Sequence, residues 1–281
     1  MEVRYLTKEE HGRSRGLYEE VFAEDEKAFV DAYYCRKTAD NRILAAEEDG
    51  VIVSMLHCNP YTFRMRGESV LADYIVAVAT KVKFRHRGLM RSLLTKALRD
   101  MRSEEKPFTF LMPADEAIYL PFDFRLMGNE DEEGLALLGE EELSQMYDLY
   151  VQKDALYEKR HIFWQEWETT PMMIRIVHLP SFLKHITADR EVSITLKIED
   201  RILEENNGVF VWTLTPEGGS LCASEGEPEL SVSIADLGSF LCGMLGAEEL
   251  PGISEKEDGA SLRERLERVQ PLNGIYINET V

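Results

Sequence analysis

A short basic segment between an apolar run and a helical pattern has the composition of an anion-binding loop. The apolar run covers residues 72–80, and the segment after it ends in Arg85-x-x-Gly88. A loop that joins a strand to a helix points backbone N–H groups and the positive end of the helix dipole at one place, which suits a phosphate. Gly88 would let the backbone approach the anion closely, because glycine has no Cβ. The alternative is an ordinary strand-to-helix turn with solvated basic residues.

Two elements must position this loop. Residues 72–80 are apolar and rich in β-branched side chains, which indicates a buried strand. After Gly88, apolar side chains recur at helical spacing and predict a helix with one buried face. These side chains are Leu89, Leu93, Leu94, Ala97, Leu98 and Met101.

The charge of the chain is distributed unevenly. The net charge of −20 argues against a nucleic acid as partner. Residues 1–128 hold 20 basic and 21 acidic side chains, whereas residues 129–281 hold 12 and 31. An anionic ligand would therefore bind in the first part. The basic residues of the loop region favour such a site there; they are Lys81, Lys83, Arg85, Arg87 and Arg91.

Length and composition limit the class of protein. A chain of 281 residues fits one large domain or two ordinary ones. We see no signal peptide and no apolar run of about 20 residues, so we expect a cytoplasmic protein without a membrane partner. The four cysteines are scattered and the six histidines lack ligand spacing. We therefore expect reduced thiols and no metal.

The first part of the chain predicts a strand, two helices, an antiparallel meander, and then a helix, a strand, a short helix and a strand. A capping box at Thr7 opens the first helix, and Asp49-Gly50 is a hairpin signal. The predicted helices cover residues 7–22, 24–36 and 91–101, with a short one within 113–120. The predicted strands are residues 4–6, 42–47, 51–57, 61–65, 69–80, 108–112 and 122–126.

The second part has a different pattern. Residues 130–134 are an acidic run, and residues 140–168 have helical character, which suggests a connector with one or two bridging helices. Strict alternation then predicts half-buried strands at 192–198 and 208–215. Further strands are predicted at 172–177, 220–223 and 229–234, and helices at 179–186, 235–245 and 262–268. We therefore expect three segments, 1–128, 129–170 and 171–281.

With these elements placed, residues 1–128 resemble a GNAT-type acyl-CoA N-acyltransferase. Val78-x-Thr80-x-Val82-x-x-Arg85-x-x-Gly88 matches the pyrophosphate loop of that family. Residues 118–124, Ile-Tyr-Leu-Pro-Phe-Asp-Phe, are similar to its Tyr-x-x-x-Gly-Phe signature, with Asp123 in place of the glycine. Residues 172–180, 230–237 and 276–281 resemble the sterol carrier protein-like domain and the tail of the enhanced intracellular survival group.

The resemblance implies an α+β fold class. A GNAT acyltransferase domain, with a mixed, mostly antiparallel sheet flanked by helices, would be followed by a sterol carrier protein-like α/β sheet domain. The C-terminal tail would return to the active site. The group also suggests a homo-oligomer.

The resemblance further implies acetyl-CoA as co-substrate, without a metal. Its pantetheine would pair with backbone groups around Val78, Ala79 and Thr80. Its pyrophosphate would accept N–H groups from Arg85, His86, Arg87, Gly88, Leu89 and Met90. Tyr119 would be the general acid, because a phenol with a pKa near ~10 is protonated at neutral pH and can protonate a leaving thiolate. The terminal carboxylate of Val281 would accept the amine proton or orient the amine.

The implied reaction is acetyl transfer to a primary amine of a cationic acceptor by direct attack in a ternary complex. Aminoglycosides, polyamines and lysine or N-terminal amines all fit, so the partner is a small molecule or a peptide. Two other hypotheses remain open. One is a hydrophobic-ligand-binding module in residues 171–281 behind a degenerate front domain, and the other is a CoA-binding scaffold or sensor without turnover.

Two further sets of residues have two interpretations each. Acidic residues could form a mouth that attracts a cationic amine, or could be solvated faces; they are Glu24, Asp25, Glu26, Asp115 and Glu116. Aromatic residues could line an acceptor pocket or, as we expect, pack in the core; they are Phe29, Tyr33, Phe63 and Phe84.

Overall fold

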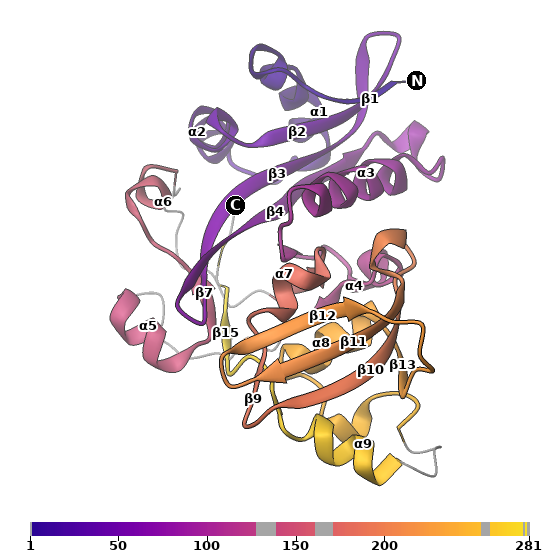
Figure 1. The fold of residues 1–281 in the computed structure, drawn as a ribbon. Helices are drawn as coiled ribbons and strands as arrows, with labels where there is room; N and C mark the ends of the chain where they lie inside the picture. The colour runs from indigo at the N-terminus through magenta and orange to yellow at the C-terminus, as the bar shows by residue number, and fades with distance from the viewer. Residues whose placement is uncertain (1, 128–138, 161–170, 254–258, 278, 280–281) are drawn as a thin grey trace.

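The computed structural model describes residues 2–127, 139–160, 171–253, 259–277 and 279. Within these residues, a large front sheet is mixed and mostly antiparallel, with seven strands along one path and β7 and β15 attached beside β3 (Figure 1). This confirms the α+β fold class. The path runs β1 (Glu2–Tyr5), β2 (Arg42–Glu48), β3 (Val51–Met65), β4 (Glu68–Thr80), β5 (Phe108–Leu111), β8 (Met173–Ile176) and β6 (Arg125–Leu126).

Two tight turns build the meander from β2 to β4. Asp49 and Gly50 both have positive φ, and so do Arg66 and Gly67. Positive φ at both central residues gives the type I′ turn, whose twist matches that of paired strands. The predicted hairpin at Asp49-Gly50 is therefore confirmed.

β3 is one strand of 15 residues, although the sequence predicts two shorter strands that flank Pro60. β2 pairs with β3 only as far as Cys58, and β7 (Leu149–Val151) begins to pair at Phe63. Pro60 therefore lies where β3 has a single neighbour, β4. Its missing N–H can face the unpaired side there, so the proline does not end the strand.

Helices cover both faces of the front sheet. α3 (Leu89–Ser103) packs on one face through the predicted apolar residues, all buried. α1 (Arg15–Val21) and α2 (Lys27–Arg36) pack on the other face near the N-terminal strands. The capping box at Thr7 is confirmed, but it opens a 3-10 segment, η1 (Lys8–Ser14), which precedes α1. The remaining 3-10 segments of the front domain are η2 (Lys37–Ala39), η3 (Val82–Phe84) and η4 (Leu120–Phe122).

The connector contains a strand that the sequence does not predict. α5 (Glu140–Met146) and α6 (Ala155–Arg160) are the expected bridging helices. Between them, β7 pairs with β3 on one side and with β15 (Ile275–Tyr276) on the other. The predicted acidic run at 130–134 and part of the helical region lie outside the described residues. The connector therefore ties the C-terminal tail to the front sheet.

The C-terminal domain has its own four-stranded sheet, in orange in Figure 1. Its predicted strands and helices are confirmed with small shifts of their ends. β8 instead pairs with β5 and β6 of the front sheet, although the sequence groups it with the C-terminal domain. The elements are α7 (Leu179–Leu183), β9 (Thr187–Ala188), β10 (Val192–Glu199), η6 (Glu204–Asn206), β11 (Gly208–Thr215), β12 (Gly218–Ala223), β13 (Leu230–Ser233), α8 (Ile234–Leu241), η7 (Ala247–Glu249), α9 (Gly259–Leu266) and β14 (Val269–Gln270).

One core joins the two domains. Phe63 and Phe108 of the front sheet belong to the same buried cluster as Phe182 and Trp212 of the C-terminal domain. The Phe108 and Phe182 rings meet edge to face, with centroids 6.4 Å apart. The C-terminal domain therefore covers the front sheet on the face opposite α3.

Candidate active site

β4 and β5 run together for only two residue pairs and then separate. The parallel pairing joins Asp73 to Thr109 and Tyr74 to Phe110, and β4 continues to Thr80 without β5 beside it. On its other edge, this part of β4 remains paired with β3. The structure therefore has an unpaired strand edge after Tyr74, open to an extended ligand that could add to it.

A β-bulge lies in this unpaired part of β4. His57 pairs with Val76 and Met55 with Ala79, so Ala77 and Val78 both lie opposite Leu56. Ala77 has a φ of 52°, which is unusual for a residue with a side chain. Bulges turn side chains and backbone groups away from the regular ladder and are common beside active sites. The carbonyls of Ala79 and Thr80 already accept hydrogen bonds from Ser54 Oγ and Arg85 Nε.

The basic loop leads from β4 directly into α3. Gly88 is the N-cap residue in left-handed conformation, with a φ of 78°. Among the described residues, no hydrogen bond is donated by the backbone amides from His86 to Arg91. The amides at the start of a long helix lack partners within the helix and carry its positive dipole end. The loop therefore has the donors that a diphosphate needs.

The side chains of the loop are also suited to binding an anion. Lys81 forms an ion pair with Glu20 at 2.8 Å. Lys83, Arg85 and Arg87 have no acidic partner among the described residues and are exposed. Val82 is 72% exposed, which is unusual for a large apolar side chain. Other exposed apolar side chains lie on the segment that follows β5; they are Met112, Ile118 and Leu120.

Tyr119 ends α4 (Glu116–Tyr119) on the α3 face of the sheet, in the cluster that includes Ile75 of β4. The side chain is 6% exposed, and burial raises the pKa of its phenol to about 12. Arg175, fully buried on β8, holds the following turn by donating from Nε to the Phe122 carbonyl at 2.7 Å. Asp123 has a φ of 63°, a conformation that glycine adopts more easily. The residue that departs from the family signature thus keeps the backbone shape of a glycine.

A buried polar cluster lies on the opposite face of the sheet, between α2 and the C-terminal domain. Lys37 donates to the Tyr61 hydroxyl at 2.8 Å, and Tyr157 donates to Glu279 Oε1 at 3.1 Å. Burial lowers the pKa of Lys37 to about 8 and raises the pKa of Glu279 to about 7. Burial is the main cause that raises the pKa of the Tyr74 phenol. Glu279 and Tyr119 both lie close enough to raise it further.

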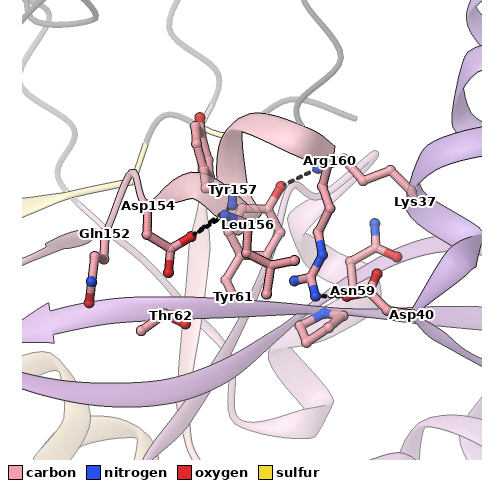
Figure 2. Close-up of a pocket in the computed structure, with 11 residues that line it drawn as sticks. Lys37, Asp40, Asn59, Tyr61, Thr62, Gln152, Asp154, Leu156, Tyr157 and Arg160 are labelled. Atoms are coloured by element: carbon pink, nitrogen blue, oxygen red, sulfur yellow. Dashed lines mark hydrogen bonds and ion pairs between the residues drawn. The ribbon is translucent and has the colours of Figure 1, made fainter.

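A small pocket opens beside this cluster (Figure 2). It is lined by Lys37 and Tyr61 together with residues of α6 and of the β3 segment near Pro60. Its cavity volume is about 20 Å³, which holds roughly one water molecule. Arg160 and Asp40 form an ion pair at its edge. The cavity therefore borders Lys37, Tyr61 and Tyr157 of the polar cluster, and Glu279 is not among its lining residues.

The structure places the other candidate residues as follows. Val281 lies outside the described residues. Phe29 and Tyr33, Phe63, and Phe84 are buried in three different clusters, so the core interpretation holds. Asp115 caps α4 by accepting the Ala117 amide, and Asp25 accepts the Tyr18 hydroxyl. Both carboxylates therefore have local structural partners.

The described residues contain no cluster of histidine, cysteine and acidic side chains that could hold a metal. All four cysteines are free thiols. No helix in the described ranges is long and apolar enough to cross a bilayer.

The sequence analysis missed Glu279 as a site residue, although it quotes the tail that contains it. A glutamate two residues before the last residue of the sequence gives no local signal of burial. The pairing of β15 with β7 brings the tail to α6, where Tyr157 donates to Glu279. The flanking apolar Ile275 and Ile277, both buried, are the one clue that a sequence offers.

Two parts of the chain match two known protein families. Residues 2–127 match the model of the acetyltransferase (GNAT) domain, and residues 179–273 match that of the sterol carrier protein domain. Residues 2–127 form a GNAT acetyltransferase domain. This confirms the enzyme class and the pair of domains that the resemblance implies. A comparison with curated proteins finds no match.

Solved structures share the architecture of this acetyltransferase over nearly the whole chain. Eis1 from Mycobacterium abscessus has a TM-score of 0.72 at 11% identity and covers 100% of both chains. A probable N-acyltransferase from Enterococcus faecalis V583 has a TM-score of 0.71 at 12% identity, covering 98% of this chain and 99% of the other. A GCN5-related N-acetyltransferase from Anabaena variabilis has a TM-score of 0.68 at 12% identity, with 94% and 97% covered. At these identities the likeness shows a common fold.

Proposed function

We propose that this acetyltransferase transfers an acetyl group from acetyl-CoA to a primary amine. The observation that carries the proposal is the unpaired edge of β4 after Tyr74, which leads into the partnerless amides of residues 86–91. A pantetheine arm could add to the bulged edge at Ala77 and Val78, beside Ala79 and Thr80. The diphosphate would accept hydrogen bonds from the amides of His86 to Met90, with added attraction from the exposed arginines. The Arg85 amide, which the sequence also suggests as a donor, already donates to the Val82 carbonyl at 3.2 Å.

The two faces of the sheet suggest how two substrates meet. Tyr119 lies on the α3 face, while Lys37, Tyr61 and Glu279 lie on the opposite face. Both sides come close to Tyr74, at the point where β4 and β5 separate. The thioester would reach this point along the strand edge and the amine from the polar cluster. This arrangement supports direct attack in a ternary complex, with Tyr119 protonating the leaving thiolate.

The acceptor we propose is a cationic primary amine, such as an aminoglycoside, a polyamine, a lysine side chain or an N-terminal amine. The acidic surface of the chain would attract such a cation. The terminal carboxylate of Val281 would orient the amine or accept its proton. Support for this role comes from the docked tail, because Ile277 and Glu279 are buried beside the polar cluster.

Calorimetry and an amine screen test the proposed function. Acetyl-CoA should bind with micromolar affinity, and CoA should be released with at least one of kanamycin, spermidine and a lysine-containing peptide. Absence of heat at high protein concentration would reject acetyl-CoA as substrate. Binding without CoA release from any amine would instead support the CoA-binding scaffold.

Extension of the chain tests the role of the terminal carboxylate. A short glycine–serine segment added after Val281 should lower turnover tenfold or more, because it removes the carboxylate from its position, and should leave acetyl-CoA affinity unchanged. The control is the same segment added before Met1. Full activity of the C-terminally extended variant would exclude Val281 from the mechanism.

A further inference from the structure

We propose that the Glu279 side chain is the general base that deprotonates the acceptor ammonium group. The inference rests on the proposed function and adds a catalytic residue to it. The terminal carboxylate then keeps the orienting role, since an α-carboxyl with a pKa near ~3.5 is a poor proton acceptor.

The position of Glu279 is unusual for a glutamate. The residue is 2% exposed, and isolated buried carboxylates are strongly disfavoured unless they are paired. One oxygen, Oε1, accepts the Tyr157 hydroxyl. No described residue makes a hydrogen bond of good geometry to Oε2, although the Tyr61 hydroxyl lies near enough to the carboxyl to interact with it weakly. An unpartnered polar atom in a buried site costs about 1–3 kcal/mol. Such an atom can accept a hydrogen bond from a bound ligand. The N–H of an ammonium group is a suitable donor.

Charged and titratable groups face Glu279 from every element that surrounds it. Burial is the largest influence and favours the protonated carboxyl, whereas Lys37, Tyr157, Lys153 and Tyr61 lower its pKa. The balance leaves the pKa at about 7. A general base works best when its pKa is near the working pH, because it is then both ionised and basic. Tyr74 of β4 is a further titratable neighbour among the described residues, and Glu279 raises the pKa of its phenol.

The proton balance of the step is complete. Glu279 takes one proton from the ammonium nitrogen, and the freed lone pair attacks the thioester carbonyl carbon. The C–N bond forms and the C–S bond breaks. The nitrogen loses its second proton to solvent as the amide forms, and Glu279 also returns its proton to solvent. The sulfur takes a proton from Tyr119, which is reprotonated from solvent. One proton is released in total, and no oxidant or metal is required.

Two amines of similar size and different basicity test the proposal: propylamine, which is an ammonium ion at neutral pH, and 2,2,2-trifluoroethylamine, which is already neutral. Glu279→Gln should lower kcat/KM for propylamine about tenfold to a hundredfold and remove the acid limb of its pH profile near pH 7. The loss with trifluoroethylamine should be threefold or less, because this amine needs no deprotonation before it attacks the thioester. Lys37→Met, with Glu279 unchanged, should move the acid limb of the kcat/KM profile for propylamine to higher pH by roughly one unit. The reason is that this substitution removes a cation near the Glu279 carboxyl.

Controls separate this role from a structural one. Glu158→Gln removes an exposed carboxylate from α6 and should change neither amine's rate. Hydrogen exchange at Ile275 and Tyr276 should be the same in Glu279→Gln and wild type if the tail remains docked. If Glu279→Gln turns over propylamine at the wild-type rate from pH 6 to 8, Glu279 is not the base and the proposed function stands. If wild type acetylates neither amine nor any amine of the screen, the proposed function fails and this inference with it.

The same carboxyl should appear in the pH dependence of stability. Its pKa is about 7 in the folded chain and ~4.3 in the unfolded chain, so between these values the folded state holds a proton that the unfolded state has lost. Stability from this group is therefore present below pH ~4.3 and is lost as the pH rises through 7. The urea midpoint of Glu279→Gln should rise relative to wild type over that range. A constant difference between the two midpoints would mean that Glu279 is an ordinary carboxylate.

Discussion

Gly88→Val should raise the dissociation constant of acetyl-CoA a hundredfold or more. Gly88 has a φ of 78°, and a β-branched residue is strongly disfavoured in that conformation. No atom of the described structure lies within 4 Å of an added Cβ, so the effect comes from the backbone and not from a clash inside the protein. The loop would relax and turn the amides that follow Gly88 away from the diphosphate. Titration calorimetry with acetyl-CoA measures the loss of affinity. A hundredfold increase in the dissociation constant corresponds to about 2.7 kcal/mol of binding free energy.

Gly50 provides a matched control for Gly88. It has a φ of 76° and nothing within 4 Å of its added Cβ, but it lies in the hairpin between β2 and β3. Gly50→Val should cost a similar amount of stability and leave acetyl-CoA affinity within about twofold. Gly88→Asn should bind more tightly than Gly88→Val, because asparagine tolerates the left-handed conformation. Wild-type affinity of Gly88→Val would show that the diphosphate lies elsewhere.

Tyr119→Phe should lower kcat a hundredfold or more and leave acetyl-CoA affinity unchanged. Removal of a general acid typically costs this much. Burial raises the pKa of the phenol to about 12, so Tyr119 is protonated at neutral pH and has a proton to give to the departing thiolate. Phenylalanine fills the same space beside Phe124, with which Tyr119 now packs at a centroid distance of 6.0 Å. The loss would therefore be chemical and not structural.

Tyr5→Phe is the control for this change. The Tyr5 hydroxyl donates to Asp100 near the C-terminal end of α3, away from the loop at its N-terminal end. Loss of that hydroxyl should reduce stability slightly and leave kcat within about twofold. The measurement is CoA release at saturating acetyl-CoA and saturating amine. Unchanged turnover of Tyr119→Phe would remove Tyr119 from the mechanism.

Local patterns predicted most of the fold. Gly208–Thr215 alternates strictly and is β11 with those bounds, and the apolar spacing after Gly88 is the buried face of α3. Two features needed long-range information. β7 has three residues and no pattern of its own, and exists because β3 and β15 pair with its two edges. β3 passes through Pro60 because its neighbours end on either side of that residue.

The candidate site divides in the same way. The donor side follows one contiguous stretch, from β4 through Gly88 to α3, so its residues could be named from their order. The assignment of Val78 to Met90 and Tyr119 to acetyl-CoA, and the three-segment division of the chain, remain predictions. The proposed acceptor side joins Lys37, Tyr61, Tyr157 and Glu279 from four distant segments. No periodicity links such residues, because only the pairing of β15 with β7 brings the last of them into place.

The pairing of β15 with β7 has a consequence for the order in which parts of the enzyme fold during synthesis. The ribosome makes β3 and β7 long before β15, so a growing chain can complete the acetyl-CoA loop while the acceptor side still lacks Glu279. We expect a chain that ends at residue 274, just before β15, to bind acetyl-CoA without transferring its acetyl group. Acetyl transfer would then begin only after β15 and the residues that follow it have been synthesised and β15 has paired with β7.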